Sequence, residues 1–301
     1  MKKNVTKGKI FPIVAWTLAT LWVIVFLYFL FWLGITSVKS IYDFKFNPFG
    51  WPDPIKGGKS SFYGWNFKNY KTAYESIYII RWGVKYEAHH MIGNSLFYAC
   101  GMALCAIIPP CLVSYLLAKY HYIPYVAAVW GFVLVIRYIP ISASMAACIT
   151  YLKRLGLFDS MFGVYLWTLN GFEGQFLLLY ATWKNVSTDY RDAAFIDGAG
   201  HFRALITVMV PMVIPILLIL FIQGFIGRWN DYMGPMIYLP SYPTLSYGAW
   251  SFQFNTSNPL IAIAPVQMAG LLILSIPMFI LFMFFRKRMM NTSMTIGGLK
   301  G

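Results

Sequence analysis

The residues whose types and spacing are best suited to binding or chemistry form a polar island at positions 189–203, between two strongly apolar runs. Asp189 can cap a short helix, and Asp192 in its first turn suits the positive end of the helix dipole. Ala193 and Ala194 leave one face of that helix thin, so that the backbone of another protein could approach closely. The island therefore predicts a docking element and not a catalytic one.

A turn and a second helix follow within the same island. Asp197-Gly198 predicts the turn, because glycine tolerates the left-handed dihedral angles that end helices. The second helix restarts near Ala199 and becomes an apolar span that contains Pro211 and Pro215.

Two charged residues, Arg137 and Glu173, fall well inside long apolar runs. At a rise of 1.5 Å per residue both lie near the middle of a bilayer, within about 5 Å of the same depth. An unpaired charge there is costly, so the two residues pair with each other or face a water-filled cavity. An ion pair that fixes two helices and a place in a solute pathway both remain open.

Another candidate binding pattern is Trp229-Asn230-Asp231. It offers an aromatic face beside polar groups that form hydrogen bonds, a combination used in the recognition of sugars. The alternative is an interfacial anchor that closes a membrane span.

Cysteine and histidine indicate neither a metal site nor catalysis. The four cysteines all fall in apolar segments, at spacings that suit neither metal ligands nor a disulfide framework. His89-His90 and His121 lack a metal-ligand partner at helical spacing. No His/Asp cluster is present to build a membrane-embedded enzyme, so we expect no metal and no catalytic residues in this chain.

Composition indicates a membrane protein. Hydrophobic residues make up 59% of the chain and charged residues 11%, against about 25% charged in soluble domains. Aromatic residues reach 19%, as interfacial belts require. The net charge of +14 is not gathered into a soluble basic face, so it does not indicate nucleic-acid binding.

The pattern of apolar runs predicts an all-α, polytopic protein with six transmembrane helices, each close to the 20 residues that one crossing needs. The predicted spans are residues 11–33, 91–117, 125–148, 162–183, 205–226 and 265–285. The first run is too long for the apolar core of a cleaved signal peptide.

Orientation follows from the basic residues. The segments assigned to the inside hold twelve Lys and Arg in 54 residues, and those assigned to the outside hold eleven in 106. This bias places both termini and the 189–203 island in the cytoplasm. Residues 1–90 then comprise the N-terminus, the first span and a long outside loop; residues 91–285 form a five-helix core with a cytoplasmic loop at 184–204; residues 286–301 form a tail.

The outside loop contains Lys56-Gly-Gly-Lys-Ser60, which is not a phosphate-binding loop. That motif needs a glycine where Asp53 stands and a preceding strand. We therefore expect no ATP site in this chain.

The island resembles the loop of permease subunits of bacterial ABC importers. That loop runs Glu-Ala-Ala, three residues, Gly, nine residues, Ile, any residue, Leu-Pro. This chain has Asp192-Ala-Ala194, Gly198 and Val208-x-Val210-Pro211 at the same spacings, with Asp for Glu and Val for Ile and Leu.

The resemblance extends over nearly the full chain and is strongest to the carbohydrate type, the branch similar to the G subunit of the maltose permease. Motifs that contribute are Ser37-Val-Lys39, Asn69-Tyr70, Asn94-Ser95-Leu96, Trp229-Asn-Asp-Tyr232 and Gly297-Gly-Leu-Lys-Gly301. The chain departs from the family upstream of the loop, where Ser187 replaces a frequent proline.

The resemblance implies the ABC importer permease fold in the cytoplasmic (inner) membrane of a bacterium. It implies a second permease subunit as a heterodimer partner, two ATPase subunits that carry ATP and Mg²⁺, an extracellular sugar-binding protein and surrounding membrane lipid. The chain itself would then be neither an enzyme nor a cofactor carrier.

The resemblance also implies roles for individual residues. Ala193, Ala194 and Gly198 would pack into an ATPase groove, while Arg191, Asp192 and Arg203 fix the register through charge pairs. The tail residues Leu299, Lys300 and Gly301 would reach the ATPase interface. The expected coupling residues are Arg191, Asp192, Ala193, Ala194, Asp197, Gly198, Ala199 and Pro211.

Other functions stay open at this point. One is an ABC importer for a non-sugar solute such as a peptide or a phosphonate. Another is a secondary transporter, which would share the helices but would not need the Asp192–Gly198 loop.

Overall fold

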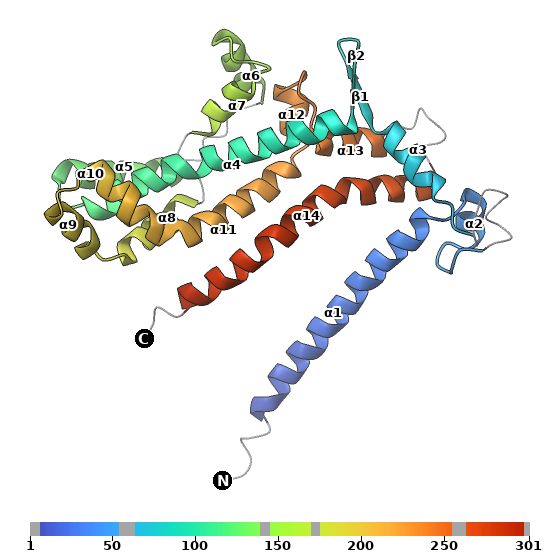
Figure 1. The fold of residues 1–301 in the computed structure, drawn as a ribbon, viewed down its shortest axis with the longest axis horizontal. Coiled ribbons are helices and arrows are strands. Elements are labelled where there is room, and N and C mark those ends of the chain that lie inside the picture. The colour runs from blue at the N-terminus through green and yellow to red at the C-terminus, as the bar shows by residue number, and fades with distance from the viewer. Residues whose placement is uncertain (1–6, 54–63, 139–144, 170–174, 255–262, 298–301) are drawn as a thin grey trace. The chain divides into compact units, whose positions relative to one another are not determined.

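The computed structural model describes residues 7–53, 64–138, 145–169, 175–254 and 263–297. In these ranges the regular structure is helical apart from one two-stranded sheet (Figure 1). The first helices are α1 (Lys7–Ser37), α2 (Ile41–Phe46), α3 (Lys68–Ser76), α4 (Ala88–Lys119), α5 (Pro124–Tyr138), α6 (Met145–Arg154), α7 (Met161–Thr168) and α8 (Gln175–Asn185). They are followed by α9 (Asp189–Ile196), α10 (His201–Ala204), the π-helical turn η1 (Leu205–Met209), α11 (Val210–Trp229), α12 (Met233–Tyr238), α13 (Leu245–Phe254) and α14 (Ala264–Gly297).

Four helical segments are long and apolar enough to cross a membrane: Pro12–Ser37, Ala88–Lys119, His201–Trp229 and Ala264–Phe284. They coincide with four of the six predicted spans. The third predicted span corresponds to α5 and α6, and the fourth to α7 and α8; residues 139–144 and 170–174, which separate the helices of each pair, lie outside the described ranges. The all-α membrane fold class is confirmed, and six crossings are compatible with it.

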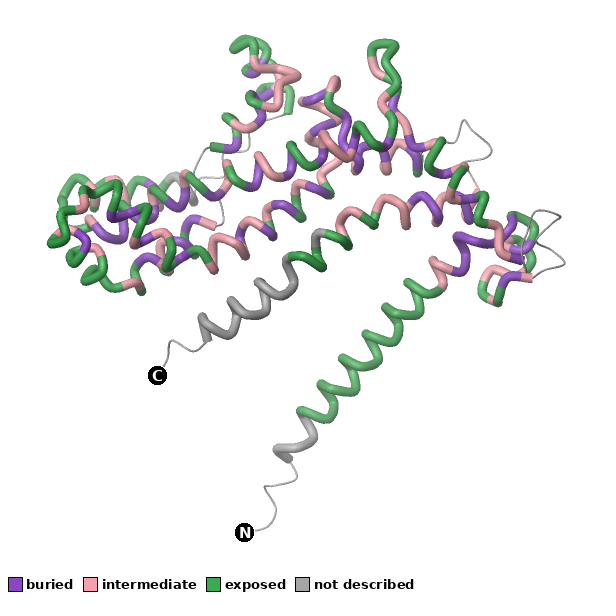
Figure 2. Tube along the Cα trace, in the orientation of Figure 1, coloured by how far each residue is buried: buried purple, intermediate pink, exposed green. Residues whose placement is uncertain are grey.

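Contacts divide the chain into two compact units. The first comprises Met1–Tyr78 and Ala249–Ile276, and the second Ile79–Gly248 and Pro277–Gly301. In the first unit, α1 exposes apolar side chains along most of its described length (Figure 2). A helix that is apolar all round is expected where lipid or another subunit covers it.

A buried polar junction follows α1 in the first unit. The Asn69 side chain donates hydrogen bonds of 2.8 Å to the carbonyl oxygens of Ser37 and Lys39. The hydroxyls of Ser37 and Tyr70 lie 2.7 Å apart, and Lys39 Nζ donates to the Asn47 carbonyl at 2.5 Å. The two short motifs at 37–39 and 69–70 are therefore parts of one junction that ties the long loop to the end of α1.

A β-hairpin that the sequence reading missed precedes α4. Its strands are β1 (Tyr78–Arg81) and β2 (Val84–Glu87). The two connecting residues, Trp82 and Gly83, have φ angles of 53° and 78°. Two positive φ angles in a two-residue loop are those of a type I′ turn, whose twist matches that of the strands.

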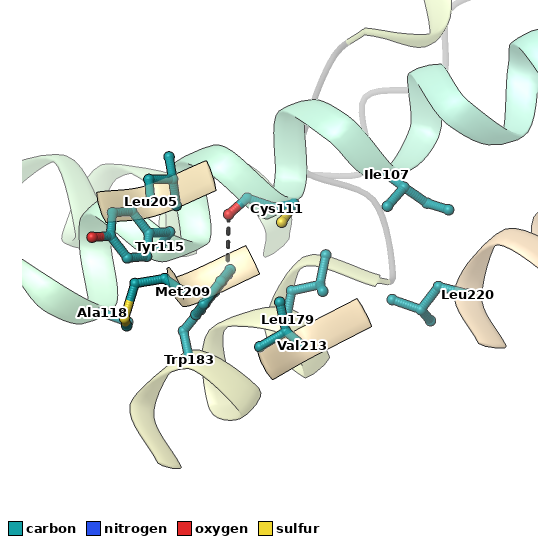
Figure 3. Close-up of a cluster of buried hydrophobic side chains, with 10 residues drawn as sticks. All are labelled: Ile107, Cys111, Tyr115, Ala118, Leu179, Trp183, Leu205, Met209, Val213 and Leu220. Atoms are coloured by element: carbon teal, nitrogen blue, oxygen red, sulfur yellow. Dashed lines mark hydrogen bonds between the residues drawn. The ribbon is translucent and has the colours of Figure 1, made fainter. Parts of the chain in front are cut away.

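The core of the second unit lies between α4, α8, η1 and α11. Figure 3 shows the cluster: Ile107, Cys111, Tyr115, Ala118, Leu179, Trp183, Leu205, Met209, Val213 and Leu220. Trp183 is fully buried, and its indole Nε1 donates a 3.1 Å hydrogen bond to the Cys111 carbonyl. Its ring meets that of Tyr115 edge to face, at 5.1 Å between centroids. The hydrogen bond satisfies the indole N–H, and the two contacts together fix α8 against α4.

Candidate functional site

The helix α9 begins at Asp189, with Thr188 as the preceding cap residue. Asp189 is thus the first helical residue, and the prediction that its side chain caps the helix is wrong. Its amide N–H is instead accepted by the Ser187 hydroxyl at 3.2 Å. Asp189 and Asp192 both lie in the first turn, where a carboxylate suits the helix dipole.

The turn after α9 is a Schellman motif. The amide of Ala199 donates to the Ala194 carbonyl at 2.9 Å, and that of Gly198 to the Phe195 carbonyl at 3.0 Å. Gly198 has a φ of 81°, the left-handed value that the motif requires. The predicted role of Gly198 in this turn is confirmed.

Arg191 anchors α9 to the end of α4. Its guanidinium pairs with Asp192 at 2.8 Å and donates to the Lys119 carbonyl at 3.3 Å. It also lies over the rings of Tyr120 and Phe195, at 5.2 and 5.7 Å from their centroids. Burial alone would lower the pKa of Arg191, but the hydrogen bond and charge of Asp192 outweigh burial and raise it. The side chain is only 11% exposed, so Arg191 is fixed in place.

The start of α10 is tied back to the same anchor. His201 Nδ1 lies 2.9 Å from the Tyr120 hydroxyl, and its ring meets that of Phe195 edge to face at 4.7 Å. The helix begins at His201 after Gly200, two residues later than the predicted start at Ala199. Tyr120 and His201 were not singled out from the sequence, because their contact spans 81 positions.

The surface of the island is more apolar than the sequence reading indicated. Ala193 is exposed, whereas Ala194 is buried, so only the first of these two small residues faces outward. Ile196 and Phe202 are 87% and 75% exposed and are the most exposed large apolar side chains of the island. The sequence offered one indication of their exposure, namely that both are apolar residues within a polar stretch.

Pro211 lies just inside α11, immediately after the π-helical turn. In that turn the Val210 amide donates to the carbonyl of Leu205, five residues earlier. Pro211 has no amide hydrogen and is tolerated in the first turn of a helix. Such π turns are frequent at functional sites.

The candidate solute side lies at the other end of α11. Trp229 is buried and stacks on Phe225, at 5.6 Å between ring centroids. Asn230 is exposed, and its side chain donates to the Ile226 carbonyl at 2.9 Å.

Asp231 is occupied by contacts within the chain. Its Oδ2 accepts from the Tyr98 hydroxyl at 2.7 Å and lies 3.9 Å from the Arg228 guanidinium, and its Oδ1 accepts from the Gly234 amide at 2.9 Å. A hollow of about 520 Å³ adjoins these residues, lined by Gly224, Gly227, Arg228, Asn230, Asp231 and Tyr232. Arg228 was missed, although it is the one basic residue between positions 227 and 264.

The chain is similar to permease proteins of several transport systems. It is 25% identical over 228 residues to the diacetylchitobiose uptake system permease protein NgcG of Streptomyces coelicolor, covering 75% of this chain and 68% of that protein. It is 24% identical over 240 residues to the maltodextrin transport system permease protein MdxG of Bacillus subtilis, covering 79% and 81%. It is 27% identical over 193 residues to the maltodextrin transport system permease protein MalD of Streptococcus pneumoniae, covering 63% and 67%. No protein-family model matches the chain.

A solved structure decides the fold. The chain superimposes with a TM-score of 0.70 on a bacterial ABC transporter involved in the import of the acidic polysaccharide alginate, at 20% identity, covering 95% of this chain and 99% of that chain. This chain has the fold of an ABC importer permease. The resemblance indicated by the motifs is confirmed by the permease relatives and by this fold.

Several residues predicted to act in the permease lie outside the described structure. Glu173 is one of them, and the side chain of Arg137, near the end of α5, is also undescribed. Their pairing therefore stays a prediction. The tail residues Leu299, Lys300 and Gly301 also lie outside the described ranges.

Within the described ranges, the permease has no group of three or more His, Cys, Asp or Glu side chains that could hold a metal ion.

Proposed function

We propose that this permease is the membrane-spanning subunit of an ATP-driven importer that moves a sugar or oligosaccharide across the cytoplasmic membrane of a bacterium. The observation that carries the proposal is the geometry of α9. Arg191 fixes this helix to the end of α4, and the Schellman turn at Gly198 ends it. The names of relatives from diacetylchitobiose uptake and maltodextrin transport systems support a sugar as the solute.

The coupling site consists of α9, its Schellman turn and the start of α10. Ile196 and Phe202 project from it as apolar side chains that a groove on an ATPase subunit would bury. Each buried aliphatic or aromatic side chain contributes about 1.5–3 kcal/mol to such an interface. Because Arg191 packs on Tyr120, a displacement of α9 would be delivered to the end of α4 without sliding.

The proposed partners are those that the resemblance to ABC importer permeases implies. Two ATPase subunits carry ATP and Mg²⁺ and bind the coupling site of this chain and that of a second permease subunit. An extracellular binding protein delivers the solute to the opposite side of the membrane. ATP hydrolysis belongs to the ATPase subunits, so this chain performs no chemistry. Both termini of the chain and the coupling site lie in the cytoplasm, in agreement with the bias of basic residues.

The solute passes the far end of α11. Asn230 and Arg228 line the hollow there, and the exposed Asn230 amide keeps one N–H donor beyond its bond to the Ile226 carbonyl, whereas the carboxylate of Asp231 is held by Tyr98 and Gly234. We assign hydrogen bonding to the solute to Asn230 and a structural role to Trp229 and Asp231.

Co-purification tests the function. The chain is purified with the products of neighbouring genes, and ATPase activity is measured with a panel of sugars and their binding protein. We expect an ATPase and a second permease to co-purify, and one class of sugar to stimulate hydrolysis. If a peptide or a phosphonate stimulated ATP hydrolysis and no sugar did, the solute would be that compound and not a sugar. Uptake that depends on a proton gradient without an ATPase would overturn the proposal.

A further inference from the structure

A basic hollow lies where α4 ends, α5 begins and α8 ends, all within the second unit. It measures about 520 Å³. Its lining includes Lys119, His121, Trp130, Tyr180, Lys184 and Ser187. The candidate span of α4 ends at Lys119, so the hollow lies at the boundary of the membrane.

Lys119 is a buried cation without a counter-charge in the described part of the chain. Its residue is 5% exposed, and its ammonium donates to the Val186 carbonyl. No carboxylate in the described ranges forms an ion pair with it, and the charged group that its backbone carbonyl contacts is the Arg191 guanidinium, a second cation. A buried charge is costly unless it is paired, and an ammonium has two further N–H donors after the first. The site therefore favours an anion.

The rim of the hollow supplies donors of the kind that phosphate oxygens accept. Lys184 and Ser187 come from the end of α8 and the segment after it, and His121 from the turn before α5. All three are exposed, so they can change rotamer to meet a ligand. Together with Lys119 they offer ammonium, hydroxyl and imidazole donors around one space.

The wall of the hollow is aromatic. Trp130 stacks on Tyr180 with ring centroids 4.2 Å apart and planes 16° apart, and both rings line the space. Tryptophan and tyrosine are the residues that gather at the level of lipid headgroups. Basic pockets between transmembrane helices on the cytoplasmic side bind anionic headgroups.

We propose that this hollow binds the phosphate headgroup of an anionic phospholipid, with Lys119 as its buried counter-charge and the Trp130–Tyr180 pair beside its glycerol. The choice of leaflet rests on the cytoplasmic orientation in the proposed function. The bound headgroup also bears on the coupling site, because the Lys119 carbonyl accepts a hydrogen bond from Arg191. Lipid binding would thus hold the end of α4 to which α9 is anchored.

The test uses the assembled importer in nanodiscs of phosphatidylcholine, with or without phosphatidylglycerol. Native mass spectrometry counts the phosphatidylglycerol that stays bound. The variants are Lys119→Gln and the rim double variant His121→Gln/Lys184→Gln, and the matched control is Arg154→Gln at an exposed position on α6.

We expect the rim variant to bind phosphatidylglycerol about fivefold more weakly, as for removal of one lysine from a membrane surface. The control should bind it as the wild type does. If Lys119→Gln does not fold, the rim variant alone decides. Equal binding by the wild type and the rim variant, or an equal loss in the control, would overturn the inference.

Two further arms separate the sources of the anion. Inorganic phosphate added to the nanodiscs that contain phosphatidylglycerol should not displace the bound lipid; full displacement by phosphate would show a site for free phosphate and would overturn the inference. If the permease pair without its ATPase subunits held phosphatidylglycerol and the assembled importer did not, an acidic side chain of the ATPase would be the occupant, and the inference would be overturned. Because these readouts measure lipid and not transport, a failure of sugar import would overturn only the proposed function.

Discussion

The hydroxyl of Tyr98 donates a 2.7 Å hydrogen bond to Oδ2 of Asp231 and so joins α4 to the end of α11 across 133 positions of the sequence. The approach is close because Gly234 faces the pair. A Cβ at Gly234 would lie 2.5 Å from Asp231 Oδ2 and 2.6 Å from the Tyr98 oxygen. The motif residue Asp231 thus joins two helices, whereas the neighbouring Asn230 is exposed and bonds only to the Ile226 carbonyl of its own helix among the described contacts.

Tyr98→Phe should lower the free energy of unfolding by about 1.5–3 kcal/mol, the range for a hydrogen bond to a charged group. Thermal unfolding of the purified permease in detergent measures the change. Tyr125→Phe is the matched control, since Tyr125 is 76% exposed. Equal stability of the two variants would show that the bond to Asp231 contributes nothing.

Gly198→Val should leave membrane insertion intact and uncouple ATP hydrolysis from transport. A β-branched residue at a φ of 81° adds about 1–3 kcal/mol of backbone strain, although no other atom obstructs a Cβ there. Uptake and ATPase activity are measured at equal membrane levels. Gly200→Ala serves as control, because Gly200 has a φ of −71° that alanine adopts freely. Normal uptake by Gly198→Val would contradict the mechanical role of the turn.

Trp183→Phe should lower the free energy of unfolding by about 1 kcal/mol, because it removes the hydrogen bond to the Cys111 carbonyl while keeping most of the packing. Trp183→Ala should lower the free energy of unfolding by about 3–5 kcal/mol, since it also opens a cavity in the core. Chemical denaturation of both variants separates the two contributions. If phenylalanine proved as costly as alanine, the indole contact and not the packing would hold α8 to α4.

Arg137→Met and Glu173→Gln should each reduce the folded yield, because the surviving charge is left unpaired in a low-dielectric interior. The double variant should recover part of that loss. Folded yield by size-exclusion chromatography and uptake are measured in parallel. A double variant that folds well but transports nothing would place the two residues in the solute pathway instead.

The sequence by itself determined the features that depend on local chemistry. Continuous apolar runs require a membrane, and the turn at Gly198 follows from a glycine at the end of a short helix. The hairpin turn at Trp82-Gly83 also depends on local sequence. It was missed from the sequence because its glycine lies in a loop that contains many other turn residues. The four longest helices lie where the apolar runs predicted them.

The tertiary structure alone decided which distant residues meet. The rotation of each helix about its axis sets which side chains face the core, and hydropathy in an almost wholly apolar span carries little information about that rotation. Arg191 therefore could be predicted to pair with a charge, but not to lie on Tyr120. In the same way the sequence shows Lys119 only as a basic residue at the end of a span. Packing alone buries it beside Val186, with no counter-charge among the described residues.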